Sequence, residues 1–236
     1  MRLSVVGDRR LGDNDSLVEA FARVGERYGY TEVKAEFAAF RDFKVKWVRS
    51  YKWVNFDVSD YMKEAPTEVL EGIADTLFMR MKGESEAKYS PTVVGWLTSE
   101  EFRRINQATY LSRYRATSVG TKGRVRDLAD SVSRLVEAGL IEDDPEIKLR
   151  WALDSRTNSS AKSSVLMKTV IVSDRLDSKD VTDHVFDYVV YSQIANIMMG
   201  YNPGRSSKGD VYARMLEMYP MMSEAEEGLR MMDMTL

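Results

Sequence analysis

The spacing of apolar residues changes several times along the chain, and each change predicts a different element. Leu17, Phe21 and Val24 recur at helical spacing. Residues 44–48, KVKWV, and 53–58, WVNFDV, alternate apolar and polar side chains, which is typical of strands with one buried face. We therefore expect a helix followed by strands in this part of the chain.

Two later stretches are apolar over a helical length. The run 69–81 follows Pro66, which suits the first turn of a helix. The run 185–199, VFDYVVYSQIANIMM, contains no Gly and no Pro and predicts a helix buried in the core. A further helix is expected over 99–115, before the linker-like residues 116–123, ATSVGTKG.

After this linker, the order of elements recurs. A helix is expected over 125–138 and strands over 147–151 and 165–172. The triplet Val-Ser-Asp precedes the long apolar helix in both halves, at 58–60 and at 172–174. Trp151 in IKLRW takes the place of Trp47 in KVKWV. The sequence thus predicts an α+β fold built as a tandem repeat, with domains 1–120 and 121–236.

Each repeat is expected to contain a helix, a mixed sheet, a central helix and a closing helix. Small polar residues fill 154–164, DSRTNSSAKSS, and predict an exposed hairpin loop between the strands of the second copy.

Three adjacent polar residues interrupt the second central helix. Ser192, Gln193 and Asn196 lie at positions i, i+1 and i+4, so the first and last share a helical face. Zinc peptidases place H-E-x-x-H at this spacing, with two histidines on the metal and a glutamate as base. Serine and asparagine are poor zinc ligands, and the glutamine amide is no base at neutral pH.

Residues 170–196, VIVSDRLDSKDVTDHVFDYVVYSQIAN, resemble the SprT-like and minigluzincin-like zinc peptidases, including archaeal members. In this resemblance, Ser192 and Asn196 stand at the two histidine positions and Gln193 at the glutamate position. The nearest match to the third ligand is Ser207 or Lys208. The resemblance implies two small zincin-like modules, of which the second keeps the active-site helix without its ligands.

Composition limits the possible chemistry. The chain of 236 residues has a net charge of −3, no cysteine and one histidine, His184. A zinc site built from several histidines is therefore excluded, and we expect no metal and no cofactor. No uncharged apolar run reaches the roughly 18 residues of a membrane helix. We expect a soluble, cytoplasmic protein without a membrane partner.

Residues 44–53, KVKWVRSYKW, are the alternative source of function. Lys44, Lys46 and Arg49, with Trp47 and Trp53, could contact phosphates and stack on bases. A strand pair with one solvated face explains the same pattern, and the acidic chain favours that explanation.

The leading hypothesis is a catalytically inactive, zincin-like pseudoenzyme that binds or scaffolds another protein through the inherited cleft. The alternatives are a nucleic-acid-associated protein that uses residues 44–53, and an enzyme of unrecognised chemistry. If the cleft persists, Ser192, Gln193 and Asn196 should border a partly solvated pocket.

Overall fold

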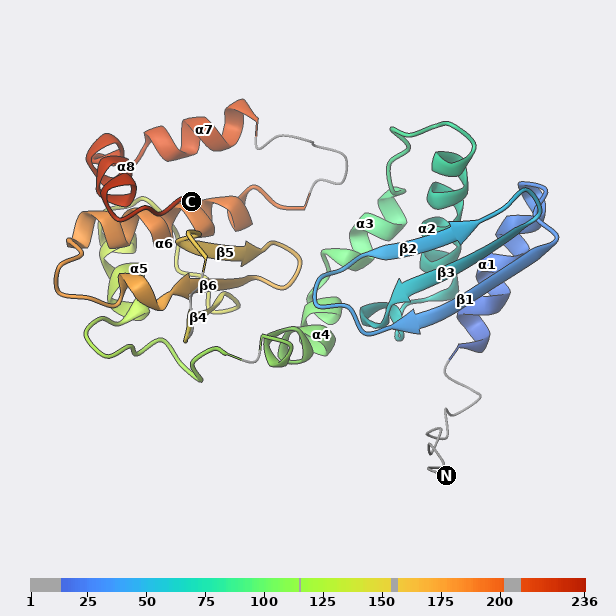
Figure 1. Ribbon diagram of the computed structural model, residues 1–236, viewed down its shortest axis with the longest axis horizontal. Coiled ribbons are helices and arrows are strands. Elements are labelled where there is room, and N and C mark those ends of the chain that lie inside the picture. Colours follow the sequence, from blue (N-terminus) through green and yellow to red (C-terminus); the bar gives the residue numbers. More distant parts are fainter. Residues whose placement is uncertain (1–13, 115, 154–156, 202–208) are drawn as a thin grey trace, which may run out of the picture. The chain divides into compact units, whose positions relative to one another are not determined.

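The computed structural model describes residues 14–114, 116–153, 157–201 and 209–236, and its fold is α+β (Figure 1). The chain forms two compact units, Met1–Phe102 and Arg103–Leu236. The division falls within helix α4 (Glu100–Ser112) rather than after residue 120. The linker-like residues 116–123 belong to the second unit, where Thr117 forms an antiparallel bridge with Ala152.

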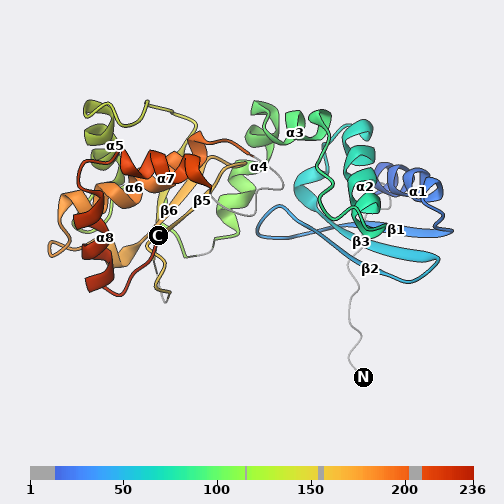
Figure 2. The same cartoon turned by 90° about the horizontal axis from the view of Figure 1, so that it is seen from above.

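The N-terminal unit carries a three-stranded mixed sheet. Its elements are α1 (Asp15–Arg27), β1 (Glu32–Ala38), β2 (Val45–Arg49), β3 (Trp53–Ser59), the 3₁₀ helix η1 (Asp60–Met62), α2 (Thr67–Met81) and α3 (Pro91–Leu97). The strand order is β1-β3-β2, with β1 parallel and β2 antiparallel to β3. In Figure 2, α1 and α2 lie on one side of this sheet, and the buried residues Val54, Phe56 and Val58 of β3 form its apolar face.

The C-terminal unit repeats this order. It contains α5 (Leu128–Glu137), β4 (Lys148–Ala152), β5 (Ala161–Ser164), β6 (Thr169–Ser173), the 3₁₀ helix η2 (Asp174–Leu176), α6 (Asp183–Met198), α7 (Asp210–Glu217) and α8 (Met222–Met231). Its sheet order is β4-β6-β5, again with the first pair parallel and the second antiparallel. The two Val-Ser-Asp triplets end β3 and β6 and begin η1 and η2. A tandem duplication would leave this shared order; the duplication itself stays a prediction.

The proposed pairing of the two tryptophans is wrong. Trp47 lies on β2, the hairpin strand, and its side chain is 40% exposed. Trp151 lies on β4, which corresponds in order to β1, and it is stacked on Phe186 in the core. The mismatch arises because the predicted elements did not include β1, EVKAEFA, so the hairpin strand β2 stood in its place as the first strand of the unit.

The expected hairpin loop over 154–164 is also wrong at its C-terminal end, because Ala161–Ser164 forms strand β5. Its four residues, AKSS, have little intrinsic strand preference. They are held by antiparallel pairing with β6, in which Ser163 lies opposite Val170. Tertiary pairing therefore decides the structure here. Residues 154–156 of the expected loop lie outside the described residues.

Helix α6 is the centre of the C-terminal unit. It contacts α5, α7, α8, β5 and β6, which Figure 1 shows gathered around it. Twelve of its sixteen residues are buried, as expected for a helix that is apolar on nearly every side. Among the helices of the described residues, none is long and apolar enough to cross a membrane.

Asp177 ties the loop before α5 to the segment before α6. Its carboxylate accepts backbone N–H groups from Arg124, Val125 and Arg126 at 2.6–2.9 Å. Burial raises the pKa of this carboxyl, but the three N–H donors outweigh burial and leave the pKa below its ordinary value. The charged form is therefore the one that the fold stabilises.

Replacing this carboxylate should destabilise the unit. We expect Asp177→Ala to lower the free energy of unfolding by about 2–4 kcal/mol, because three backbone donors lose their acceptor. The measurement is the urea midpoint at neutral pH. Asp143→Ala, at an exposed carboxylate, is the control and should stay within about 0.5 kcal/mol.

The effect should also depend on pH. Since the folded-state pKa of Asp177 is lowered, its contribution is complete above the unfolded value of about 3.9 and is lost as the pH falls through the lowered pKa. The difference between the wild type and Asp177→Ala should therefore shrink in acid. An equal difference at pH 7 and pH 2 would contradict the assignment.

Candidate functional site

The polar residues of α6 form a connected hydrogen-bond network. The Ser192 hydroxyl donates to the Val189 carbonyl at 2.8 Å and accepts from the Gln193 amide at 3.2 Å. The Ser192 carbonyl also accepts from the Tyr212 hydroxyl at 3.1 Å. The helical spacing thus brings the expected residues together, but each binds its neighbours rather than a ligand.

Ser163 on β5 completes this network from the facing sheet. Its hydroxyl donates to the Gln193 amide oxygen at 2.9 Å and accepts from the Asn196 amide nitrogen at 3.0 Å. Ser163 points toward α6 because it lies opposite Val170, and paired residues share a sheet face. We call Ser163, Ser192, Gln193 and Asn196 the serine–amide network.

The expected partly solvated pocket is contradicted for two of its three residues. Ser192 is fully buried and Gln193 is 4% exposed, while Asn196 is half-buried. A single hydroxyl on the facing strand pairs with both amide side chains, so water is not needed to satisfy them. The alternative explanation, a polar face satisfied by core contacts, describes this helix.

The network has none of the groups that hydrolysis requires. Neither the serine hydroxyls nor the amides contact a base that could accept a proton. Among the described residues, no three His, Cys, Asp or Glu side chains lie close enough to hold a metal ion. Ser207 and Lys208, the candidates for a third ligand position, lie outside the described residues.

Four tyrosines, two on α6 and two that follow it in the chain, act as hydrogen-bond donors. Tyr188, Tyr191, Tyr212 and Tyr219 donate to the Glu226 carboxylate and to the carbonyls of Met215, Ser192 and His184, respectively. Burial raises the pKa of all four hydroxyls, that of Tyr219 to about 12. They are therefore neutral at physiological pH and hold the helices together.

His184, the single histidine, is half-buried in the first turn of α6. Its ring lies 3.4 Å from the Thr182 hydroxyl. It precedes Ser192 by about two helical turns, or about 12 Å along α6, and its side chain is hydrogen-bonded to Thr182, so it supplies the serine–amide network with no base.

The basic and aromatic residues of 44–53 do not share one surface. Trp47 and Arg49 lie opposite the buried residues Phe56 and Val54, and therefore on the helix-facing side of the sheet. Lys46 lies opposite Asp57 on the other side, and Trp53 shares that side by alternation along β3. The two indole rings thus cannot form one stacking platform.

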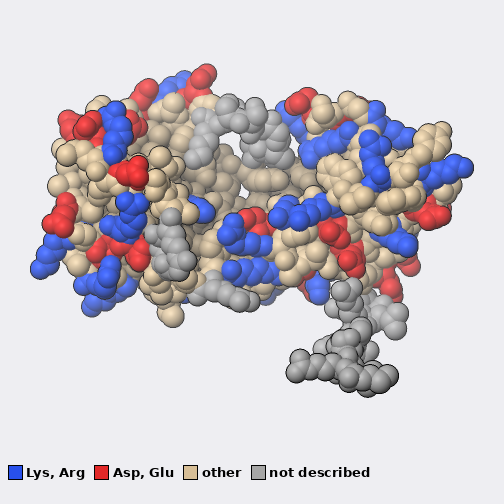
Figure 3. All heavy atoms as spheres, viewed as in Figure 1, with Lys and Arg blue, Asp and Glu red and all other residues tan. Residues whose placement is uncertain are grey.

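The cations of this hairpin have acidic and aromatic neighbours. The Lys44 and Lys46 ammonium groups lie 4.8 Å and 5.4 Å from the centre of the Phe40 ring. Exposed Glu32 and Glu36 of β1 lie on the same side of the sheet as Lys46. Figure 3 shows acidic and basic side chains interspersed on the visible face of this unit. A single-sign field of the kind that binds nucleic acid is not formed here.

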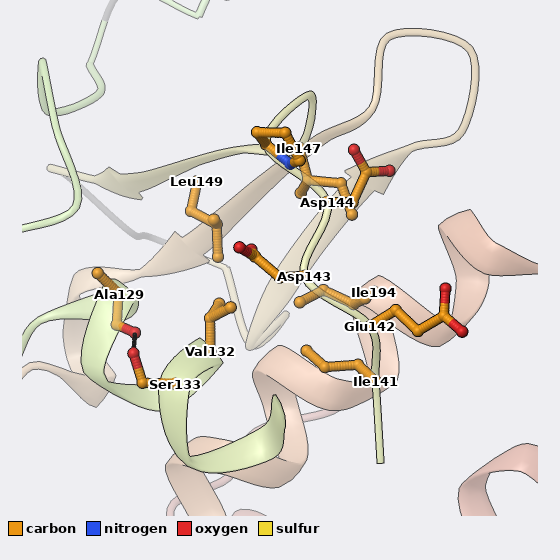
Figure 4. A pocket seen from close by; sticks show the side chains of 11 residues that line it. Ala129, Val132, Ser133, Ile141, Glu142, Asp143, Asp144, Ile147, Leu149 and Ile194 are labelled. Atoms are coloured by element: carbon orange, nitrogen blue, oxygen red, sulfur yellow. Dashed lines mark hydrogen bonds between the residues drawn. The ribbon is translucent and has the colours of Figure 1, made fainter. Parts of the chain in front are cut away.

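An apolar recess of about 250 Å³ lies between α5, β4 and α6. Val132, Ile141, Leu149 and Ile194 line it, and Figure 4 shows these side chains directed toward one another. The loop that carries Glu142, Asp143 and Asp144 also borders it. Sequence reasoning did not identify this recess, because its residues come from four separate segments.

Lys168 binds the acidic side chains near this recess. Its ammonium group lies 2.8 Å from Asp144 and 2.7 Å from Glu146. Glu146 also pairs with Arg103 of α4. Hydrogen bonds from Lys168 lower the pKa of Glu146, and for Asp144 they outweigh the opposing effect of burial. Both carboxylates are thus paired, and Lys168 favours their charged forms.

Comparisons with family models, with curated proteins and with solved structures found no match to this chain. The resemblance to zinc peptidases therefore depends on residues 170–196 alone, and no function is transferred from a relative.

The serine–amide network predicts a specific stability effect. Ser163→Ala should destabilise the C-terminal unit by about 2–4 kcal/mol, because the Gln193 amide oxygen and the Asn196 amide nitrogen lose their common partner. The measurement is again the urea midpoint. Lys162→Ala, at the neighbouring exposed position, is the control and should have little effect.

A triple variant separates hydrogen bonding from volume. Ser163→Ala combined with Gln193→Leu and Asn196→Leu removes all the groups that would be left unpaired, so it should recover part of the lost stability. If Ser163→Ala alone has no effect, water satisfies the amides and the network is an open site after all.

Proposed function

We propose that this protein is a non-catalytic binding module for another protein, derived from a zincin-like peptidase. The observation that carries the proposal is the serine–amide network. The helix that resembles the peptidase active site uses its three polar side chains to bind Ser163 and one another. Side chains committed in this way hold no metal and activate no water.

The proposed ancestry includes two zincin-like modules. The repeated order of helix, three strands, 3₁₀ helix and helix supports it, as does the resemblance of residues 170–196. When α2 and α6 are aligned from their first residues, Thr67 and Asp183, Thr76 falls at the position of Ser192. The Thr76 hydroxyl donates to the Gly72 carbonyl of its own helix. The first module is proposed to be equally inactive.

We place the partner surface away from the proposed cleft, because Ser192 and Gln193 on that face of α6 are buried. The hairpin formed by β2 and β3 is the better candidate. Val48 and Trp53, which share the side of the sheet away from the helices, are 66% and 37% exposed, and neighbouring exposed apolar side chains mark sites of protein interaction.

Nucleic acid is the second candidate partner. Lys44, Lys46 and Arg49 close to Trp47 and Trp53 favour it, because phosphate contacts and base stacking use these residue types. Their distribution over both sides of the sheet, among carboxylates, argues against it. The test is the affinity for a single-stranded oligothymidylate between about 50 and 200 mM salt. A nucleic-acid-binding protein should lose affinity steeply over that range, because phosphate contacts weaken as salt is added.

The proposal makes two predictions, one about bound zinc and one about peptidase activity after a glutamate is restored at position 193. Purified protein should carry no stoichiometric zinc, and Gln193→Glu should not hydrolyse casein, because a base has little to activate without metal-bound water. Elemental analysis and a protease assay are the measurements. One tightly held zinc per chain, or peptidase activity in that variant, would refute the proposal.

A further inference from the structure

We infer that the free edge of β2 binds an extended, acidic segment of a partner protein as an additional strand. The inference rests on the proposed function, and it names the surface and the chemical character of the partner. It depends on the direction of the backbone groups of β2 and on the charges along the hairpin.

The backbone groups of β2 alternate between β3 and the outside. The Ser59 N–H donates to the Lys44 carbonyl at 3.1 Å, and the Ser50 N–H donates to the Trp53 carbonyl at 2.9 Å. In an antiparallel pair, hydrogen-bonded residues alternate with non-bonded ones. Even-numbered residues from 44 to 50 therefore bond to β3, and the N–H and C=O groups of Val45, Trp47 and Arg49 point outward.

This outward edge has no backbone partner among the described residues. β2 is the last strand in the order β1-β3-β2, and no isolated bridge involves it. A depression of about 570 Å³ lies over the β2–β3 hairpin, lined by Val45, Lys46, Trp47, Val48, Asn55 and Asp57. An exposed edge with apolar side chains is a template for strand addition.

In the second unit, the residues just before β5 pair with Thr235. The Ser160 N–H donates to the Thr235 carbonyl at 2.7 Å, and the Thr235 N–H donates to the Asn158 carbonyl at 2.7 Å. Thr235 thereby bridges in parallel to residue 159. The Ser160 carbonyl accepts from the Ser173 N–H of β6 at 2.8 Å, so these bonds lie on the side of the strand that faces β6 and do not use the outer edge of β5.

Charge selects the character of the partner. Lys44, Lys46, Arg49 and Lys52 flank the edge within nine residues, and no ion pair involves them in the described structure. An acidic strand would pair with these cations. A second copy would instead bring the same four cations to the interface. Nucleic acid would satisfy the outward N–H groups but leave the outward carbonyls without donors.

The experiment begins with a peptide selected on the full-length protein from a random 12-residue phage library. Enriched sequences should alternate apolar with acidic residues. Synthetic peptides methylated at single backbone nitrogens should lose at least about tenfold in affinity at every second position only, because alternate N–H groups bond to β2. A side-chain pocket would not produce this period.

Variants of β2 supply the second arm. Trp47→Pro removes an outward N–H that β3 does not use, and it should weaken peptide binding at least about tenfold. Because proline can disturb the strand, Lys46→Glu with Arg49→Glu is the parallel variant, which should reject acidic peptides. Lys179→Glu, at an exposed site of the second unit, is the matched control and should bind normally.

Each contrary outcome has a distinct meaning. Selected peptides that bind without the methylation period, or equally well to the β2 variants, would overturn strand addition while leaving the protein-binding module intact. Failure to enrich any sequence would overturn it as well. Competition by oligothymidylate, or dimers that dissociate in the charge-reversed variant, would assign the edge to nucleic acid or to a second copy. Stoichiometric zinc would instead remove the proposed function itself.

Discussion

Burial of α6 on nearly every side is the constraint on which the C-terminal unit depends. A helix surrounded by β5, β6 and three other helices cannot leave polar side chains unpaired without a large free-energy penalty. Ser163 on the facing strand binds two of them, and three tyrosine hydroxyls donate to backbone carbonyls in and around the helix. The polar positions of this helix thus fix which strand and which helices pack against it.

The sequence was informative where apolar spacing is regular. The helices α2 and α6, strand β3 and the recurrence of elements in two units follow from runs of buried residues. The strands β1 and β5 were not predicted, for different reasons. In β1, charged residues alternate with apolar ones, which is a strand pattern that the predicted elements omitted. β5 has the composition of a polar loop, and there the pairing with a central strand outweighs local preference.

The sequence predicted which residues of the candidate site lie together, but not whether that face of the helix is open to solvent. Spacing alone placed Ser192, Gln193 and Asn196 together in α6. Whether that face is open depends on Ser163, about thirty residues earlier, which only the register of β5 brings opposite α6. The free edge of β2 could not be predicted for a related reason. Strand order is a property of the whole sheet, and it leaves no local pattern in the sequence.

The cations of β2 also bear on how copies of this protein behave in concentrated solution. Bare strand edges attract one another, and charged residues along them oppose this self-association. Repulsion between Lys46 and Arg49 of neighbouring copies acts over a Debye length of about 8 Å at 0.15 M ionic strength and about 3 Å at 1 M. Colloidal stability should therefore fall as salt is added, so dilute buffers favour the dispersed molecule.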